Sequence, residues 1–309
     1  MTEFITGWPN HPLKNTWLTI GNFDGVHLGH QALIQSLKER AEEQQGQSLV
    51  LTFWPHPRVV LGQVSEAFLL TTQQEKERQL QIAQVDLVVT LPFDQNLADM
   101  HAEAFLERLY ANLRPAGLLV GPEFRLGKNR QGDFNFIQNF CQSRGIACES
   151  FAPFTLGGEV VSSNRVRARL LEGQVEEAAN LLGRPFSLEG EVQHGKQIGR
   201  KLGFPTANFA PGPLQLLPRF GVYATRVFLG DQVLMGVTNV GVRPTFETAA
   251  TPNVETLILD FDDRIYDEMM RIEFISFLRP ELRFEHVEDL IAQIENDKAL
   301  ARRIFQNGP

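Results

Sequence analysis

The sequence predicts two domains of different class: an α/β domain built on a parallel sheet, then a small β-barrel that ends in a helix. The chain has 309 residues, which is more than one typical domain and enough for two. Short apolar runs alternate with helical patterns in the first half, whereas strand-like runs follow one another in the second half. The change comes after Gly183-Arg184-Pro185, so we expect domains over residues 1–184 and 185–309.

Five short apolar runs in the first half predict strands that are buried on both faces. They span residues 17–21, 48–53, 86–91, 117–121 and 146–151. Buried strands that alternate with helices form a parallel sheet through right-handed crossovers. Because such sheets bind ligands beyond the carboxyl ends of their strands, we expect the first functional site there.

Four helices are expected in the same half, and apolar spacing or a helix breaker marks each of them. They cover residues 97–113, 163–171, 174–182 and the segment that carries Leu33, Ile34, Leu37 and Ala41. Those four apolar residues follow the spacing of one helical face. Pro115 ends the helix that precedes it, and Gly173 separates the last two.

The second half predicts a small β-barrel closed by a helix. Its expected strands span residues 187–193, 221–229, 232–240, 256–261 and 271–277. A series of strands with no helix between them suggests a small β-barrel. Val287, Leu290, Ile291 and Ile294 then lie on one face of an amphipathic helix.

Composition excludes several classes of protein. Hydrophobic residues make up 43% and charged residues 21%, as in ordinary globular domains, which excludes collagen-like, coiled-coil and disordered chains. Lysine and arginine number 29 against 37 acidic residues, so the net charge is 29 − 37 = −8 and a nucleic-acid partner is not expected.

The first residues and the cysteines suggest where the protein works. No basic start followed by an apolar run is visible, and no window approaches the roughly 18 apolar residues of a membrane span. Cys141 and Cys148 have no zinc or redox spacing and are interpreted as reduced thiols. We therefore expect a cytoplasmic location and no membrane partner.

The strongest motif directly follows the first predicted strand and opens the first helix. Residues 21–30 read Gly-Asn-Phe-Asp-Gly-Val-His-Leu-Gly-His. A helix N-terminus offers free N–H groups and a positive dipole end to a phosphate, and glycines let the backbone approach it. The expected ATP- and phosphate-binding residues here are Gly21, Asn22, Phe23, Asp24 and Gly25.

His27 and His30 are the candidate catalytic residues of this motif, since both can present donors to one polyphosphate. A surface pair of histidines or half of a zinc site is the alternative. The zinc interpretation lacks further ligands at suitable spacing.

Three more segments lie where a parallel sheet places its ligand. Residues 52–57 end the second strand, residues 121–133 end the fourth, and residues 162–167 open a later helix. The candidate phosphate-binding side chains in the last two segments are Arg125, Ser162, Ser163 and Arg167. A solvated basic loop and a helix cap remain the alternatives for the arginine loop and the serines.

These motifs resemble the nucleotidylyltransferase superfamily, and the first half as a whole resembles the adenylyltransferase domain of bacterial bifunctional riboflavin kinase/FAD synthetases. The resemblance implies a Rossmann-like sheet and two histidines that stabilise the triphosphate during adenylyl transfer. Glu123 and Leu126 depart from the family pattern Gly-x-Asp-Phe-x-Phe-Gly, and Asn164 replaces a Thr.

The second half has no P-loop but has a basic, glycine-rich segment followed by an extended one. Its candidate residues for ATP and phosphate are Gly195, Lys196, Gly199, Lys201, Gly203, Pro205, Thr206 and Asn208. Thr206 and Asn208 are two residues apart, so both oxygens face one side of an extended segment and suit Mg²⁺. An ordinary barrel turn is the alternative for the glycine segment.

Together with residues 236–246, 254–261 and 277–281, this segment resembles the riboflavin kinase domain. The resemblance implies that Thr206 and Asn208 hold metal–ATP and that Glu255 is the base that accepts the ribityl proton. It also implies flavin contacts from Asn239, Arg243, Pro244 and Thr245. Leu257 stands where the family usually has His, which we expect to alter packing or flavin contacts.

The function expected from this resemblance is a two-step synthesis. Riboflavin and ATP give FMN at the barrel, and FMN and ATP give FAD and pyrophosphate at the sheet, with Mg²⁺ in both steps. A riboflavin kinase with weak or absent FAD synthesis, and a regulator that only binds flavin or nucleotide, are the alternatives. The oligomeric state, the transfer of FMN between sites and a preference for reduced flavin stay open.

Overall fold

The computed structural model describes the chain except residues 14, 65, 195–201, 213, 244–250 and 307–309. The chain divides into two compact units, Met1–Ser163 and Asn164–Pro309.

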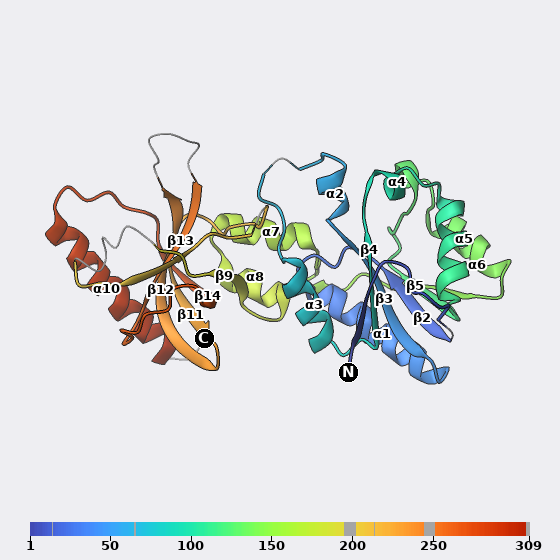
Figure 1. Ribbon diagram of the computed structural model, residues 1–309, viewed down its shortest axis with the longest axis horizontal. Coiled ribbons are helices and arrows are strands. Elements are labelled where there is room, and N and C mark those ends of the chain that lie inside the picture. Colours follow the sequence, from blue (N-terminus) through green and yellow to red (C-terminus); the bar gives the residue numbers. More distant parts are fainter. Residues whose placement is uncertain (14, 65, 195–201, 213, 244–250, 307–309) are drawn as a thin grey trace. The chain divides into compact units, whose positions relative to one another are not determined.

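A six-stranded sheet of order β1-β4-β3-β2-β5-β6 forms the centre of the first unit (Figure 1). Its strands are β1 (Glu3–Thr6), β2 (Thr16–Ile20), β3 (Gln47–Trp54), β4 (Leu87–Pro92), β5 (Gly117–Val120) and β6 (Ala147–Ser150). Every neighbouring pair is parallel, which confirms the predicted parallel sheet. The edge strand β1 was not expected.

Helices cover both faces of this sheet because successive strand residues point to opposite sides. Leu49 and Leu51 pack in one apolar cluster with α5 (Ala102–Leu113) and α6 (Phe134–Gln142). Val50 packs in a second cluster with α1 (Leu28–Glu43) and α3 (Gln73–Ile82). The strands are therefore buried on both faces, as the apolar runs predict.

The single helix expected over residues 97–113 is two helices. α4 (Gln95–Ala98) starts at Asp94, whose side chain accepts the Leu97 N–H, and α5 follows after a break. In the break, the carbonyl of Met100 accepts the backbone N–H of Lys128 at 2.8 Å. The chain therefore pairs there with the loop after β5.

Several short elements of the first unit carry no apolar signal and were not expected. They are α2 (Pro57–Val60), the 3₁₀ turn η1 (Lys128–Arg130) and the hairpin of β7 (Thr155–Leu156) and β8 (Glu159–Val160). The longer helices α3 and α6 were also not expected.

The second unit starts with two helices and continues as a six-stranded antiparallel sheet. The expected helices are confirmed as α7 (Ser163–Glu172), which begins at the unit boundary, and α8 (Val175–Leu182), and Gly173 between them has a φ of +81°. The sheet has the order β10-β13-β12-β11-β14-β9. Its strands are β9 (Phe186–Glu191), β10 (Thr206–Phe209), β11 (Gly221–Leu229), β12 (Gln232–Arg243), β13 (Thr251–Ile258) and β14 (Met269–Arg279).

The two edge strands of this sheet approach each other, as in a barrel. An isolated antiparallel bridge joins Gln193, just after β9, to Asn208 in β10. At Gly190 a Cβ atom would come within 2.6 Å of the Phe209 ring, which shows how closely β9 and β10 lie. The predicted barrel is confirmed, although β10 was not expected.

The strand expected over residues 256–261 begins earlier than its apolar run. In β13, Asn253 pairs with Gly241 and Glu255 with Asn239. Pro and Asn near the start of β13 read as turn residues in the sequence, yet the long partner β12 continues the pairing to Thr251. The strand ends at Ile258, before Asp260 with a φ of +56°.

The closing helix α10 (Val287–Gln306) packs on one face of this sheet (Figure 1). Ala301 and Ile294 share an apolar cluster with Val222, Val237 and Leu257. Asp297, 4% exposed, forms an ion pair with Arg279 of β14 at 2.8 Å, which ties the helix to the sheet. No helix among the described residues is long and apolar enough to span a membrane.

Candidate functional site

The central strands β2 and β5 of the parallel sheet are neighbours, although β3 and β4 lie between them in the chain. The strand order therefore reverses between β2 and β5. Open α/β sheets bind ligands outside the carboxyl ends of their strands at such a reversal. Residues 21–27, which directly follow β2, lie at this edge.

The loop from β2 to α1 has a strained backbone. Phe23 has a φ of +50° and Val26 a φ of +41°, and the latter is a conformation that β-branched residues rarely adopt. Gly25 between them has a φ of +86°. Strain of this kind persists only where neighbouring structure fixes it, and it is concentrated at functional sites.

His27 is the N-cap of α1, and its ring orientation follows from that position. Its Nδ1 atom accepts the backbone N–H of His30 at 3.3 Å. A neutral His27 ring must then carry its proton on Nε2. The His27 and His30 rings stack with centroids 3.7 Å apart, and a Cβ on Gly29 would come within 3.2 Å of the His27 ring.

His30 is neutral at ordinary pH. Burial lowers the pKa of His30 well below its usual range, and the nearby charges of His27 and Lys76 lower it further. Its Nδ1 atom is buried and has no hydrogen-bond partner among the described residues. Two stacked imidazoles, of which His30 is neutral, thus offer ring N–H groups at a helix N-terminus, at the edge where the sheet binds its ligand.

Asp24 anchors the loop to the residues just before α3 and to Ser163. Its Oδ1 atom accepts the N–H groups of Leu70 and Thr71, and its carbonyl accepts the Ser163 hydroxyl at 2.8 Å. The Thr71 hydroxyl in turn accepts the Gly25 N–H at 3.2 Å. Asp24 and Ser163 therefore fix the loop, and their direct contact with a phosphate stays a prediction.

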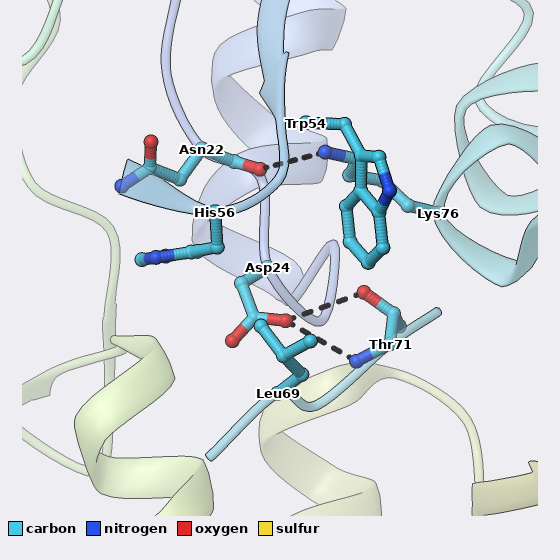
Figure 2. Close-up of a pocket in the computed structure, with 7 residues that line it drawn as sticks. All are labelled: Asn22, Asp24, Trp54, His56, Leu69, Thr71 and Lys76. Atoms are coloured by element: carbon cyan, nitrogen blue, oxygen red, sulfur yellow. Dashed lines mark hydrogen bonds between the residues drawn. The ribbon is translucent and has the colours of Figure 1, made fainter. Parts of the chain in front are cut away.

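Lys76 was missed in the sequence and lies at the same edge. Figure 2 shows its ammonium directed at the carbonyl of Asn22, beside Trp54 and above Asp24 and Thr71. A cavity of about 10 Å³, room for roughly one water molecule, lies among these residues, His56 and Leu69. Thr72-Gln73-Gln74-Glu75 has the Thr-x-x-Glu spacing of a helix N-terminus, and this spacing could have revealed α3.

His56, after β3, caps a helix N-terminus through its Nδ1 atom, as His27 does after β2. It is the N-cap of α2, its Nδ1 accepts the Arg58 N–H at 3.1 Å, and its side chain is buried. A neutral His56 ring therefore also carries its proton on Nε2. Its place beside the cavity gives residues 52–57 a direct part in this edge of the sheet.

The loop after β5 divides into an exposed and a packed part. Arg125 and Glu123 are exposed, and Lys128 pairs with Asp99 at 2.8 Å. Leu126, which departs from the family pattern, packs in the apolar cluster of the first unit with 8% exposure. That departure thus fills the core here.

Asn164 and Arg167 contact each other in the second unit, at the start of α7. The Arg167 guanidinium is buried and donates to the Asn164 Oδ1 atom at 2.8 Å. Asn164 therefore orients the arginine that the sequence predicts to bind phosphate. Ser162 precedes the helix, and its contact with phosphate stays a prediction.

The candidate kinase residues lie on one face of the barrel sheet. Asn208 and Asn239 are the direct neighbours of Glu255 on its two sides. Thr206 donates its hydroxyl to the Glu255 Oε1 atom at 2.5 Å. A carboxylate, a hydroxyl and two amides are thus brought together by β10, β12 and β13, with Gly203 and Pro205 just before β10.

Further polar groups border this set. Asn253 donates to the Asn208 Oδ1 atom at 3.4 Å, and Asn239 donates to Glu281 at 3.2 Å. Leu257 lies on the same face but packs against α10, which fits the expected effect on packing. Of the other predicted residues, those that lie outside the described residues are Gly195, Lys196, Gly199, Lys201, Pro244 and Thr245. Arg243 is described only as the last residue of β12.

Comparison with known proteins identifies a family for each half of the chain. A family model described as FAD synthetase matches residues 10–165, and one described as riboflavin kinase matches residues 182–305. A bifunctional riboflavin kinase/FMN adenylyltransferase of Escherichia coli (strain K12) is 38% identical over 296 residues, covering 95% of this chain and 94% of that protein. One of Haemophilus influenzae is 36% identical over 301 residues, covering 96% and 97%.

A solved structure also shares the fold. The crystal structure described as a macrolide-efflux protein from Streptococcus pneumoniae has a TM-score of 0.87 and 26% identity, over 98% of this chain and 99% of that one.

The fold and the sites define an ATP-dependent transferase that combines a nucleotidylyltransferase-like sheet with a kinase barrel. The family models match each part in that order, and the named relatives match nearly the whole length. The chain belongs to the bifunctional riboflavin kinase/FMN adenylyltransferase family.

Proposed function

We propose that the two reactions of this family take place at the two sites described above. Riboflavin is phosphorylated to FMN on the barrel face that carries Glu255, and FMN is adenylylated to FAD at the carboxyl edge of the parallel sheet. For the sheet, the observation that carries the proposal is the stacked pair His27 and His30 at the N-terminus of α1, in which burial keeps His30 neutral.

In the adenylyl transfer, an FMN phosphate oxygen bonds to the α-phosphorus of ATP, and the bond to pyrophosphate breaks. Negative charge accumulates on the phosphate oxygens as that bond breaks. His27 and His30, with the α1 N-terminus, are placed to donate hydrogen bonds to this charge. Arg125 and Arg167 are proposed to add positive charge for the phosphates.

In the kinase reaction, the ribityl 5′-hydroxyl attacks the γ-phosphorus of ATP and ADP leaves. Glu255 is proposed to accept the hydroxyl proton, since it is the carboxylate at the centre of this site. The Thr206 hydroxyl, which donates to Glu255, fixes the orientation of that carboxylate. Asn239 and Arg243 are proposed to contact the flavin.

Mg²⁺ fits the residues of the kinase site, because Thr206 and Asn208 present hard oxygen donors beside Glu255. These two residues would hold the metal together with ATP phosphate oxygens, and the ion would neutralise polyphosphate charge. A cytoplasmic location stays a prediction.

Chromatography of flavin products tests the assignment of the two sites. The purified protein is incubated with Mg-ATP and either riboflavin or FMN. Glu255→Gln should lower FMN formation at least about 100-fold, because it removes a general base, and leave FMN-to-FAD conversion near the parental rate. His27→Ala with His30→Ala should do the reverse.

Glu285→Gln and His11→Ala are the matched controls, because both side chains are exposed and lie outside the two sites. Loss of both activities in either site variant would refute separate sites. FMN formation without FAD in the parent protein would favour a riboflavin kinase alone, and no product at all would favour a binding regulator.

A further inference from the structure

The most unusual charged group outside the predicted motifs is Lys76 in α3. Its side chain is 3% exposed. Its Nζ atom donates to the carbonyl of Phe53 at 3.0 Å, the hydroxyl of Thr52 at 3.2 Å and the carbonyl of Asn22 at 3.4 Å. Burying an ammonium is costly, so its retention at this position calls for a function.

The three acceptors of Lys76 belong to two different parts of the edge that binds the ligand. Thr52 and Phe53 lie near the carboxyl end of β3, whereas Asn22 lies in the loop after β2. Lys76 therefore connects the ends of two neighbouring strands. The Thr52 hydroxyl also donates to the Asn22 carbonyl at 3.2 Å, so both groups hold the same point of the loop.

The segment just before α3 holds the other half of the loop. Leu70 and Thr71 donate to Asp24, and the Thr71 hydroxyl accepts the Gly25 N–H. α3 and the residues before it thus hold the loop from Asn22 to Gly25, next to the positive φ angles described above. A loop with such angles needs this outside support to keep its shape.

Lys76 also contributes charge to the site. The ammonium lowers the pKa of His30, which shows that its field reaches the histidine pair. The other charged or titratable groups that act on Lys76 are Asp24 in the loop and Glu77 in α3. The cavity beside it also contains His56.

We propose that Lys76 is a positioning residue for adenylyl transfer. Its ammonium holds the Asn22 carbonyl against the end of β3, which keeps the loop in the shape that presents its amides and the two histidines to the ATP phosphates. It also supplies buried positive charge at the same edge of the sheet. This inference rests on the proposed function of the first unit.

The first test is Lys76→Met, which keeps the length of the side chain and removes the ammonium. We expect kcat for FMN adenylylation to fall about 10- to 100-fold, the size of effect that misplaced binding groups produce, and KM for ATP to rise about tenfold. The KM for FMN should change less than about twofold. The rate of riboflavin phosphorylation by the same molecule should also change less than about twofold. A loss of folded protein alone would lower kcat and leave KM for ATP unchanged.

Lys38→Met is the matched control, since Lys38 also donates to a backbone carbonyl, that of Ala83, but lies away from the loop. The three tryptophans Trp8, Trp17 and Trp54 all belong to the first unit, so their fluorescence reports its folding alone. Hydrogen exchange should show faster exchange of the amides of residues 23–26 in Lys76→Met than in Lys38→Met.

If Lys76→Met does not fold, Thr52→Val decides, because it removes one acceptor of the ammonium and preserves side-chain shape. A rise in KM for ATP of at least about threefold supports the proposal. Parental kinetic constants in folded Lys76→Met or in Thr52→Val would overturn it. A parent protein that makes no FAD from FMN would instead refute the proposed function of this site.

Discussion

Gly29 illustrates how a single atom can decide the geometry of the first site. Added at this position, a Cβ atom would come within 3.2 Å of the His27 ring and of the Val161 carbonyl. Both neighbours are constrained, the ring by its cap bond to His30 and the carbonyl by the backbone. The glycine in the His-x-Gly-His motif therefore avoids a tight contact with both neighbours, and its φ is not positive.

Gly29→Ala should consequently displace the His27 ring. We expect FMN adenylylation to fall about tenfold or more, because a misplaced donor loses its contact with developing charge. Riboflavin phosphorylation by the same molecule should stay at the parental rate. Steady-state kinetics with each flavin measures both, and an unchanged FAD rate would show that the His27 ring can move without cost.

In the second site, the hydrogen bond between Thr206 and Glu255 links two proposed functional groups. A threonine hydroxyl that ligates a metal through its oxygen still has its proton to donate, and Glu255 accepts it at 2.5 Å. One contact can thus couple the nucleotide side of the site to the carboxylate that we propose as the base. Glu255 lies within β13, so its position is fixed by strand pairing on both sides.

At the scale of elements, local sequence patterns predicted the helices, strands and motifs whose residues are neighbours in the chain. The His-x-Gly-His segment is continuous, and its place between a strand and a helix follows from neighbouring residues. α3 was not predicted, since its residues are mostly polar and its buried face contains Glu75, Lys76 and Gln79. Lys76 contacts Asn22 across 54 residues of sequence, and no local pattern reveals such a contact.

Short edge strands were missed for a similar reason. β1 and β10 have four residues each, too few for a periodic signal, and both are defined by their pairing with β4 and β13. The departures Leu126 and Leu257 could be identified in the sequence. Their packing in apolar clusters depends on contacts between residues far apart in the sequence, which only the structure shows.

The burial of Lys76 in α3 predicts how the stability of the first unit depends on pH. Burial lowers the pKa of Lys76 from 10.5 to about 8, although Asp24 and Glu77 act in the opposite direction. Between these two pH values the unfolded state binds the proton more tightly, so the free energy of unfolding rises with pH. At 1.36 kcal/mol per pKa unit, the shift of about 2.5 units corresponds to roughly 3 kcal/mol.

Denaturant unfolding followed by tryptophan fluorescence at pH 7 and pH 10 measures this effect. His30, whose pKa Lys76 affects, is held by burial below this pH range, so the difference between the two proteins on going from pH 7 to pH 10 reports mainly Lys76. The parent should gain about 2 to 3 kcal/mol relative to the variant on going to pH 10. A difference that is constant with pH would mean that the folded ammonium titrates near its ordinary pKa.

At the scale of the whole molecule, the His27/His30 pair and Glu255 lie in different units, each with its own apolar core. The first unit has clusters on both faces of its parallel sheet, and the second has the cluster between its sheet and α10. Substitutions in one site should therefore leave the other site intact. FMN is the product of one site and the substrate of the other, which raises the question of how it travels.

We predict that FMN passes through solution, because the His27/His30 pair and Glu255 lie in different units, each with its own apolar core. An equimolar mixture of Glu255→Gln and His27→Ala/His30→Ala should then convert riboflavin to FAD, although neither variant does so alone. FMN should accumulate first, and the rate of FAD formation should follow its free concentration. Time courses resolved by chromatography, with the parent protein at the same concentration of each site, provide the measurement.

Dilution distinguishes the two routes for FMN. If FMN passes through solution, parent and mixture show the same lag before FAD appears, and in both the lag lengthens as the enzyme is diluted at fixed riboflavin. A parent protein that forms FAD without a lag at every dilution, while the mixture lags, would mean that FMN is transferred within one molecule. That result would contradict the prediction that FMN passes through solution.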